Sequence, residues 1–177
     1  MGLGRTGSLW AHQQYGAACL PDIMTLAKPL AGGLPIGAAL LTQQVADAMS
    51  PGDHGSTFAG NPLVCHAAEA AFDVINDAVF LKNVVDRGEQ LREGLKKALK
   101  GVDAVLDVRG RGLISGVQLD RPAGNVCTLA REKHGLLVLT AGKGDAVRLV
   151  PPLVLTEAEV DEGVEKLVAA IKEDLAA

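Results

Sequence analysis

The sequence predicts an α/β protein in two parts, and three features of the 177-residue chain lead to that prediction. Short apolar runs typical of strands alternate with segments of helical periodicity. Glycine, proline and small polar residues concentrate in loops of the front half, and a long amphipathic helical pattern opens the back half. We therefore expect residues 1–78 and 79–177 to form separate parts, the second an α+β unit around its own core.

The composition is that of an ordinary globular protein and argues against several kinds of partner. Hydrophobic residues make up 48% of the chain and charged residues 21%, with a net charge of -4 and dispersed lysines and arginines. Nucleic acids and membrane surfaces attract clustered basic residues, so we expect neither as a partner. The 3 scattered cysteines form no disulfide pattern or zinc motif, which predicts no metal site and a reducing, intracellular compartment.

The front half is expected to combine short strands, short helices and an open loop. Residues 22–27 and 36–41 are apolar runs that predict buried strands. Residues 51–60 (PGDHGSTFAG) are too rich in glycine, proline and small polar residues for anything but a loop. Short helices are predicted from a Ser8 cap to Gly16 and from Thr42 to Met49.

Two longer helical patterns follow that loop. Asn61 and Pro62 predict a helix start, since Asn caps well and Pro suits the first turn. The run LVCHAAEAAFDVI behind them is apolar on nearly every face, so we expect a deeply buried helix. From residue 80 to 100 the pattern is amphipathic, with one apolar face made of Leu81, Val84, Leu91, Leu95 and Leu99.

The rest of the back half alternates strands and helices. Residues 104–119 predict two strands bent at Gly110 and Gly112. Thr156 with Glu159 is a capping box for a last helix. The other predicted features are a helix from Asn125 to His134 ending at Gly135, a hairpin of LLVLT and AVRLV closed by Pro151, and a last-helix stripe of Val160, Val164, Leu167, Ile171 and Leu175.

The segment Gly2–Gly7 (GLGRTG) matches the dinucleotide-binding pattern G-x-G-x-x-G letter for letter. That pattern binds a dinucleotide only between a strand and a helix of a βαβ unit. No strand is predicted before it, and no βαβ unit with an acidic ribose partner follows. We therefore expect no dinucleotide site here.

Lys28 is the first candidate for chemistry. It directly follows the apolar run 22–27 and precedes Pro29, which favours an extended chain at Lys28. Small neighbours leave room for a bulky group, and a lysine in dry surroundings is nucleophilic toward a carbonyl. From spacing alone, a surface lysine that starts a turn is the commoner case.

The loop His54–Gly60 (HGSTFAG) is the second candidate. The adjacent hydroxyls of Ser56 and Thr57, on a glycine-flanked loop, can donate to a phosphate together with backbone N–H groups. An ordinary surface turn is the alternative, because Ser and Thr favour turns.

Arg148 is the third candidate, since it interrupts the apolar strand AVRLV. A buried arginine needs a partner, and a carboxylate that accepts two parallel hydrogen bonds suits it best. An arginine that points outward from an edge strand fits the alternation of strand side chains equally well.

Five blocks of the chain, in this order, resemble those of the class III, ornithine-type aminotransferases. This family belongs to the fold-type I pyridoxal-phosphate enzymes. The resemblance implies the later part of the large mixed-sheet domain at residues 1–78, followed by the complete C-terminal α+β small domain at 79–177. The blocks are GLGRTGSLWAHQQYG, PDIMTLAKPLAGGLPIGAAL, GDHGSTFAGNPLVCHAA, VRGRGLISGV and LTAGKGDAVRLVPPLVLTEAEV.

The resemblance also implies roles for the candidate residues. Lys28 is the Schiff-base lysine that binds pyridoxal 5′-phosphate and acts in catalysis. Thr57 binds the cofactor phosphate, typically across the interface of a homodimer. Ser56 lies beside the substrate, and Arg148 takes its α-carboxylate. Arg5 and Thr6, in the first block, are expected to be structural.

The implied activity moves an amino group from N-acetylornithine to 2-oxoglutarate, giving glutamate, in arginine biosynthesis. Ornithine, succinylornithine or 4-aminobutyrate as the donor, and a non-catalytic dimerising fragment, stay open as alternatives. Family members carry a comparably long stretch before these blocks. We therefore expect this chain to be the later part of a longer protein and inactive alone. The sequence of the last block resembles plant and algal members of the family, which implies a plastid or a mitochondrion as the compartment. The alternative is a bacterial cytoplasm.

Overall fold

The computed structural model describes residues 2–176 and divides the chain into two compact units. The first unit contains the chain up to Gly4 and Ser8–Leu81. The second contains Arg5–Gly7 and the chain from Lys82 onward. A short piece of the front half, Arg5–Gly7, is therefore built into the second unit.

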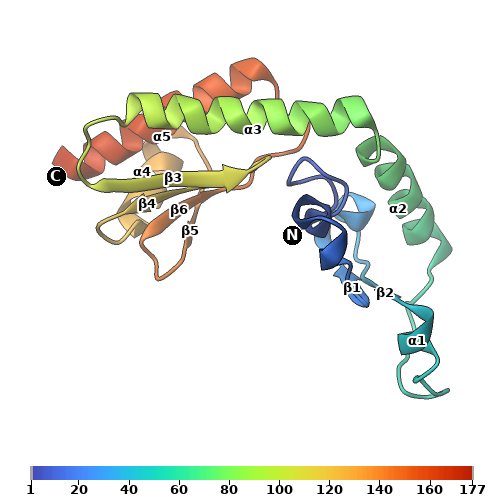
Figure 1. The fold of residues 1–177 in the computed structure, drawn as a ribbon. Coiled ribbons are helices and arrows are strands. Elements are labelled where there is room, and N and C mark those ends of the chain that lie inside the picture. The colour runs from blue at the N-terminus through green and yellow to red at the C-terminus, as the bar shows by residue number, and fades with distance from the viewer. Residues whose placement is uncertain (1, 177) are drawn as a thin grey trace. The chain divides into compact units, whose positions relative to one another are not determined.

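The first unit is made of short elements around a small core. Strands β1 (Ile23–Leu26) and β2 (Ala38–Leu41) pair antiparallel, with Leu26 opposite Ala38 (Figure 1). Leu3, Leu30 and Ile75 are buried in its core. The helical elements are η1 (Ala11–Tyr15), η2 (Ala17–Cys19), η3 (Lys28–Ala31), α1 (Gln43–Ala46) and α2 (Pro62–Ile75).

Some local predictions for this unit are confirmed and others are wrong. The Asn61 side chain caps α2 as predicted, accepting from the backbone N–H of Leu63 at 3.1 Å. Ser8 does not cap the first helix; Trp10 holds that position, and its N–H donates to the side chain of Gln13.

The predicted deep burial of α2 and of the two strands is also wrong. Ile75 is the buried residue of α2, while Leu63 is 75% exposed, and Ile23 on β1 is 55% exposed. A two-stranded sheet has few neighbours to cover its faces, so apolar residues remain exposed.

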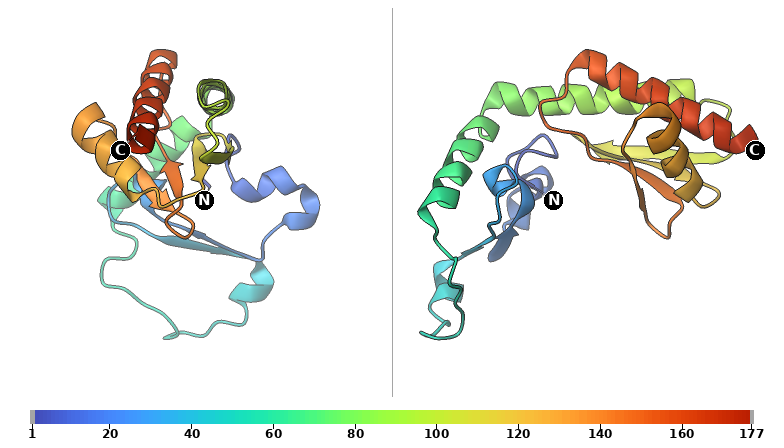
Figure 2. Two further views of the ribbon diagram at one scale, coloured as in Figure 1. Left: turned by 90° about the vertical axis from the view of Figure 1, so that its left-hand side faces the viewer. Right: turned by 180° about the vertical axis from the view of Figure 1, so that it is seen from behind.

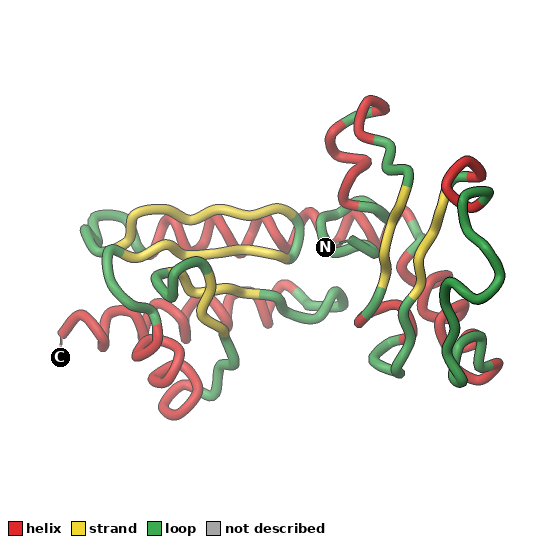
Figure 3. The backbone as a smooth tube through the Cα atoms, turned by 90° about the horizontal axis from the view of Figure 1, so that it is seen from below, coloured by secondary structure: helices red, strands yellow, loops and turns green. Residues whose placement is uncertain are grey.

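The second unit is an antiparallel sheet with helices on one face. The strand order is β3-β4-β6-β5, and all neighbouring strands are antiparallel. The helices lie on one side of the sheet in Figure 1, and the strands stand in front of them when the unit is seen from below in Figure 3. The strands are β3 (Val105–Arg111), β4 (Ile114–Leu119), β5 (Leu139–Ala141) and β6 (Ala146–Leu149), and the helices are α3 (Ala78–Ala98), α4 (Gly124–His134) and α5 (Glu157–Ala176).

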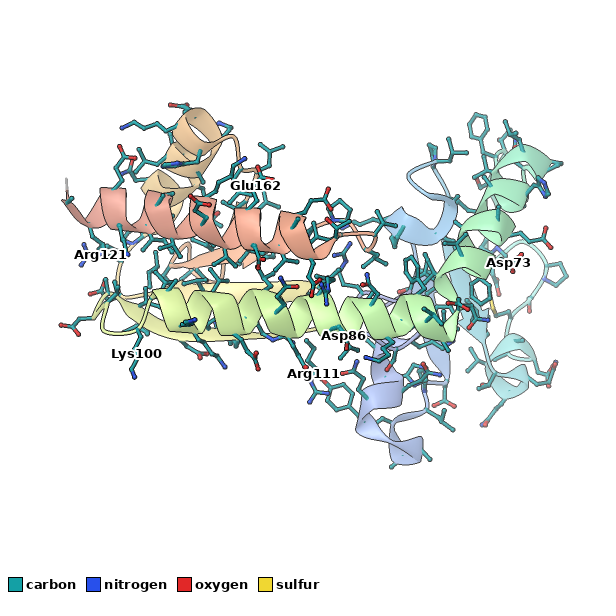
Figure 4. The ribbon with its side chains drawn as sticks, turned by 90° about the horizontal axis from the view of Figure 1, so that it is seen from above. Asp73, Asp86, Lys100, Arg111, Arg121 and Glu162 are labelled. Carbon is teal, nitrogen blue, oxygen red and sulfur yellow. The ribbon has the colours of Figure 1, made fainter. Side chains whose placement is uncertain are left out.

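The core of this unit lies between the sheet and its helices. Val108, Val117 and Val147 form one cross-strand row on the covered face and are buried. Helices α3 and α5 lie side by side over the sheet, marked by Asp86 and Glu162 in Figure 4, and α4 is seen with them in Figure 2. The apolar face predicted for α5 is confirmed as part of this core, together with Leu91, Leu95 and Leu99 of the face predicted for α3. Of the other two predicted α3 residues, Val84 is buried outside this core cluster and Leu81 belongs to the first unit.

Local signals set the boundaries of the back-half elements. In the capping box of α5, the Thr156 N–H donates to Glu159 at 2.8 Å. Gly135 ends α4 in a left-handed conformation, as predicted. Between β3 and β4, Gly112 has a φ of 48°, which suits the tight turn. Among residues 2–176, no helix is both long and apolar enough to cross a membrane.

Candidate active site

Lys28 occupies a strained backbone position directly after β1. Its φ is 51°, and only Leu3 shares a positive φ among the non-glycine residues that the structure describes. A left-handed conformation costs an L-residue roughly 1–2 kcal/mol. Such strain persists where the surrounding fold imposes it, and it clusters at functional sites.

The surroundings of Lys28 differ from the sequence prediction in two ways. Lys28 begins the 3-10 turn η3 and is not extended. Its side chain is exposed within the first unit, so the predicted dry setting is also wrong for this chain. The turn itself is anchored by the buried residues Leu30 and Ala31. At Gly32 and Gly33, where φ is 63° and 110°, no atom of the described residues comes within 4 Å of an added Cβ, so the small-residue setting is present.

The loop His54–Gly60 is an exposed turn with a free hydroxyl. The Ser56 Oγ accepts from the Phe58 N–H at 3.3 Å, and the Ser56 carbonyl accepts from the Ala59 N–H at 3.2 Å. Within residues 2–176 the Thr57 hydroxyl has no protein partner. The loop belongs to the same unit as Lys28, but no hydrogen bond or ion pair joins the two in the described part of the chain.

Arg148 lies in the second unit, on an interior strand. Strand β6 runs between β4 and β5, so the edge-strand alternative is wrong. Its neighbours Val147 and Leu149 are buried, while Arg148 itself is half-buried and pairs with Gly116 on β4 and Leu139 on β5. Because paired residues point to the same face, Arg148 lies on the face opposite the valine row.

The Arg148 guanidinium has a buried nitrogen that lacks a hydrogen-bond acceptor within residues 2–176. Its Nε is buried and has no hydrogen-bond partner among the described residues. A buried donor without an acceptor is costly, so such groups in proteins usually find one. A carboxylate that accepts two parallel hydrogen bonds fits this guanidinium best.

Gly116 and the partners of Arg5 are features that the sequence did not reveal. Gly116 stands opposite Arg148, and an added Cβ there would meet only the Val147 carbonyl at 3.8 Å. Arg5, expected to be structural, donates through Nη1 to the carbonyls of Leu113 and Pro151. The pairing of β4 with β6 could not be foreseen, because the two strands are not consecutive.

Comparison with known proteins finds similar sequences and structures over almost the whole chain. A family model described as aminotransferase class-III matches residues 1–171. The mitochondrial acetylornithine aminotransferase of Alnus glutinosa is 53% identical over 173 residues, which are 96% of this chain and 37% of that protein.

Solved structures of the same kind superpose closely. The ornithine aminotransferase of Toxoplasma gondii has a TM-score of 0.89 at 33% identity, covering 99% of this chain and 42% of that one. The N-acetylornithine aminotransferase of Stenotrophomonas maltophilia has a TM-score of 0.86 at 38% identity, covering 99% and 45%. The chain thus spans less than half the length of these proteins, and the predicted α/β fold is confirmed. The chain belongs to the class-III aminotransferase family.

Proposed function

We propose that this chain is the later part of an aminotransferase that moves an amino group from N-acetylornithine to 2-oxoglutarate with pyridoxal 5′-phosphate. The observation that carries the proposal is Lys28, an exposed lysine in a left-handed conformation at a strand end. Family membership supports the reaction class, and the similar proteins named for acetylornithine support the donor.

The side chains of the first unit suit this cofactor. The exposed Lys28 amine can bind its aldehyde carbon covalently, and the free Thr57 hydroxyl can donate to its phosphate. Ser56 is proposed to lie beside the substrate. When bound, pyridoxal 5′-phosphate supplies an electron sink for the carbon that carries the amino group.

The chain's own residues would hold the reactants and move a proton. The Lys28 amine would take a proton from the substrate carbon that carries the amino group and would later return one. Arg148 binds the substrate's α-carboxylate through two parallel hydrogen bonds, which supplies the partner that its Nε lacks. Residues outside this chain complete the site, since the similar proteins are more than twice as long.

The parts of the chain have proposed places in the whole enzyme. Residues 1–78 are proposed as the later part of the large domain and 79–177 as the small domain. We further propose a homodimer, with Thr57 reaching the partner's cofactor. Strongly exposed apolar side chains that follow Thr57 in the sequence, with Phe58 83% and Leu63 75% exposed, support an interface there. An intracellular compartment is proposed, and a mitochondrion is supported by the name of the Alnus glutinosa relative.

Steady-state rates of the intact enzyme test the donor. We expect the highest kcat/KM with N-acetylornithine among the four candidate ω-amines. Ornithine is the second candidate, because the Toxoplasma gondii ornithine aminotransferase superposes with a TM-score of 0.89. A higher kcat/KM with ornithine, succinylornithine or 4-aminobutyrate would show that this amine, and not N-acetylornithine, is the donor. No turnover, and no visible absorption band after addition of pyridoxal 5′-phosphate, would identify a non-catalytic protein.

A further inference from the structure

The ladder between β4 and β6 stops just before a proline. It runs from Gln118 opposite Ala146 to Ser115 opposite Leu149. Continuing this register by two residues places Leu113 opposite Pro151. Proline has no backbone N–H, so it cannot donate a ladder bond to the Leu113 carbonyl. The carbonyls at this position therefore need donors from another part of the chain.

Arg5 provides those donors. Its Nη1 donates to the Leu113 carbonyl at 2.8 Å and to the Pro151 carbonyl at 2.6 Å. The Arg5 carbonyl in turn accepts from the Leu113 N–H at 3.0 Å. The Arg5 backbone lies so close to the turn that residue 112 must be glycine, since a Cβ on Gly112 would lie 2.4 Å from the Arg5 carbonyl oxygen. Arg5 thus extends the β4–β6 pairing beyond the point where proline ends it.

This extension fixes the end of the strand that carries Arg148. Arg148 lies three residues before Pro151, and its backbone is held by β4 on one side and β5 on the other. Strand β6 ends at Leu149, and beyond that residue Arg5 bridges the carbonyls of Pro151 and of Leu113, the residue directly before β4. A shift of the C-terminal end of β6 would turn the buried Arg148 Nε away from a bound carboxylate.

We propose that Arg5 is a positioning residue for Arg148, holding its guanidinium in the orientation that binds a substrate carboxylate. This inference rests on the proposed function, in which Arg148 binds that carboxylate. Arg5 does not touch the substrate itself; it acts through the β6 backbone.

Arg92 offers a matched control. It donates through Nη1 to the Gly112 carbonyl at 2.7 Å and to the Ser115 Oγ at 3.3 Å, beside the same turn. Both arginines are partly buried, and burial lowers the pKa of each. No hydrogen bond of Arg92 in the described residues reaches Pro151. Loss of either arginine should therefore lower stability, but only loss of Arg5 should disturb Arg148.

The test measures glutarate binding to the intact enzyme by calorimetry, which needs no turnover. Arg5→Lys should raise the Kd by about tenfold, the scale of one lost hydrogen bond to a charged group. Arg92→Lys should change it by less than about twofold, although both variants lose thermal stability. In an Arg148→Lys background, Arg5→Lys should cause no further loss, because it acts through Arg148.

A rescue variant tests the inference even if Arg5→Lys folds poorly. Pro151→Ala restores a backbone N–H opposite the Leu113 carbonyl. The double variant Arg5→Lys/Pro151→Ala should therefore recover much of the glutarate affinity that Arg5→Lys loses. Equal loss in the Arg5 and Arg92 variants, or no recovery, would show that Arg5 is only structural while Arg148 still binds carboxylate. If Arg148→Lys leaves the glutarate Kd unchanged, the proposed role of Arg148 and this inference both fail.

Discussion

Lys28 and Arg148 each have a local conformation or environment that is unfavourable for their residue type. Lys28 adopts a conformation that glycine would adopt without strain, and the buried Nε of Arg148 has no acceptor within residues 2–176. Each departure has a direct explanation if a ligand completes the site. In a class-III aminotransferase the ligands are proposed to be the cofactor at Lys28 and a substrate carboxylate at Arg148.

Arg148→Lys should weaken the binding of both amino-acid substrates. A lysine ammonium carries the charge but cannot make the two parallel hydrogen bonds of a planar guanidinium, so KM should rise about tenfold. Arg109→Lys is the control, because Arg109 lies on the same sheet face but is already engaged by Asp107 and Gln118. Steady-state kinetics with glutamate and N-acetylornithine measure both. Unchanged KM in Arg148→Lys would mean that this arginine serves another purpose.

Thr57→Ala should loosen the cofactor more than it slows the reaction. Loss of one hydrogen bond to a charged phosphate costs roughly 1.5–3 kcal/mol. Thr57→Ser keeps a hydroxyl and should keep most of the affinity. Titration of the apoenzyme with pyridoxal 5′-phosphate gives the Kd of each variant. Equal affinity in the alanine variant and the original enzyme would show that the loop is only a turn.

At the residue scale the sequence proposes candidate residues, but it does not contain how they are placed. Residue types and spacing single out Lys28, Ser56, Thr57 and Arg148, whose roles stay proposals. The left-handed conformation of Lys28 and the burial of the Arg148 Nε depend on tertiary contacts, so no local pattern contains them. The bridging role of Arg5 depends on the pairing of two distant strands, which is equally absent from the local sequence.

Among the elements of the second unit, α3 approaches the turn between β3 and β4 closely at Gly88. A Cβ added to Gly88 would lie 2.0 Å from the Gly112 carbonyl oxygen, in the turn between β3 and β4. Such a distance leaves no room for any side chain. The crossing of helix and turn therefore depends on glycine at position 88, and it sets the spacing between α3 and the turn.

Gly88→Ala should destabilise the chain by at least about 2 kcal/mol, because the backbone must shift to relieve the overlap. Gly163→Ala is the matched control, since Gly163 also lies in a helix but has no atom within 4 Å of an added Cβ. That variant should gain roughly 0.5–1 kcal/mol from helix propensity. Urea denaturation measures both changes. Equal effects of the two substitutions would contradict the close crossing.

Elements were predictable where the signal is local. The Asn61 cap, the Thr156–Glu159 capping box and the Gly135 stop are short motifs, and the structure confirms each one. The burial of α2 was not predictable in this way, because an apolar run does not say which faces meet a neighbour. Most of α2 is exposed or half-buried in the first unit.

At the scale of the whole chain, the two units differ in how well they bury their apolar residues. The second unit has one continuous core between sheet and helices, while the first has a small core and many exposed apolar side chains. All residues of the loop 51–60 are exposed. Resistance to proteases follows burial and hydrogen bonding of the backbone, so the units should differ in resistance.

Limited proteolysis of the 177-residue chain should cut the first unit first. We expect chymotrypsin to cleave after Phe58, which is 83% exposed, and to leave a stable product that contains the chain from α3 to the C-terminus. The same 177-residue chain should show no detectable transamination. Mass spectrometry of the products gives the order of cleavage. Early cuts within β3–α5, or robust glutamate formation by the 177-residue chain, would contradict this account.

The identity of the lysine that binds the cofactor tests the central claim most directly. The intact enzyme is loaded with pyridoxal 5′-phosphate, reduced with borohydride to fix the bond, digested and mapped by mass spectrometry. We predict the pyridoxyl group on Lys28 and on no other lysine, with the label lost in Lys28→Ala. A pyridoxyl group on Lys82, Lys143 or any other lysine would contradict the assignment of this chain's active site.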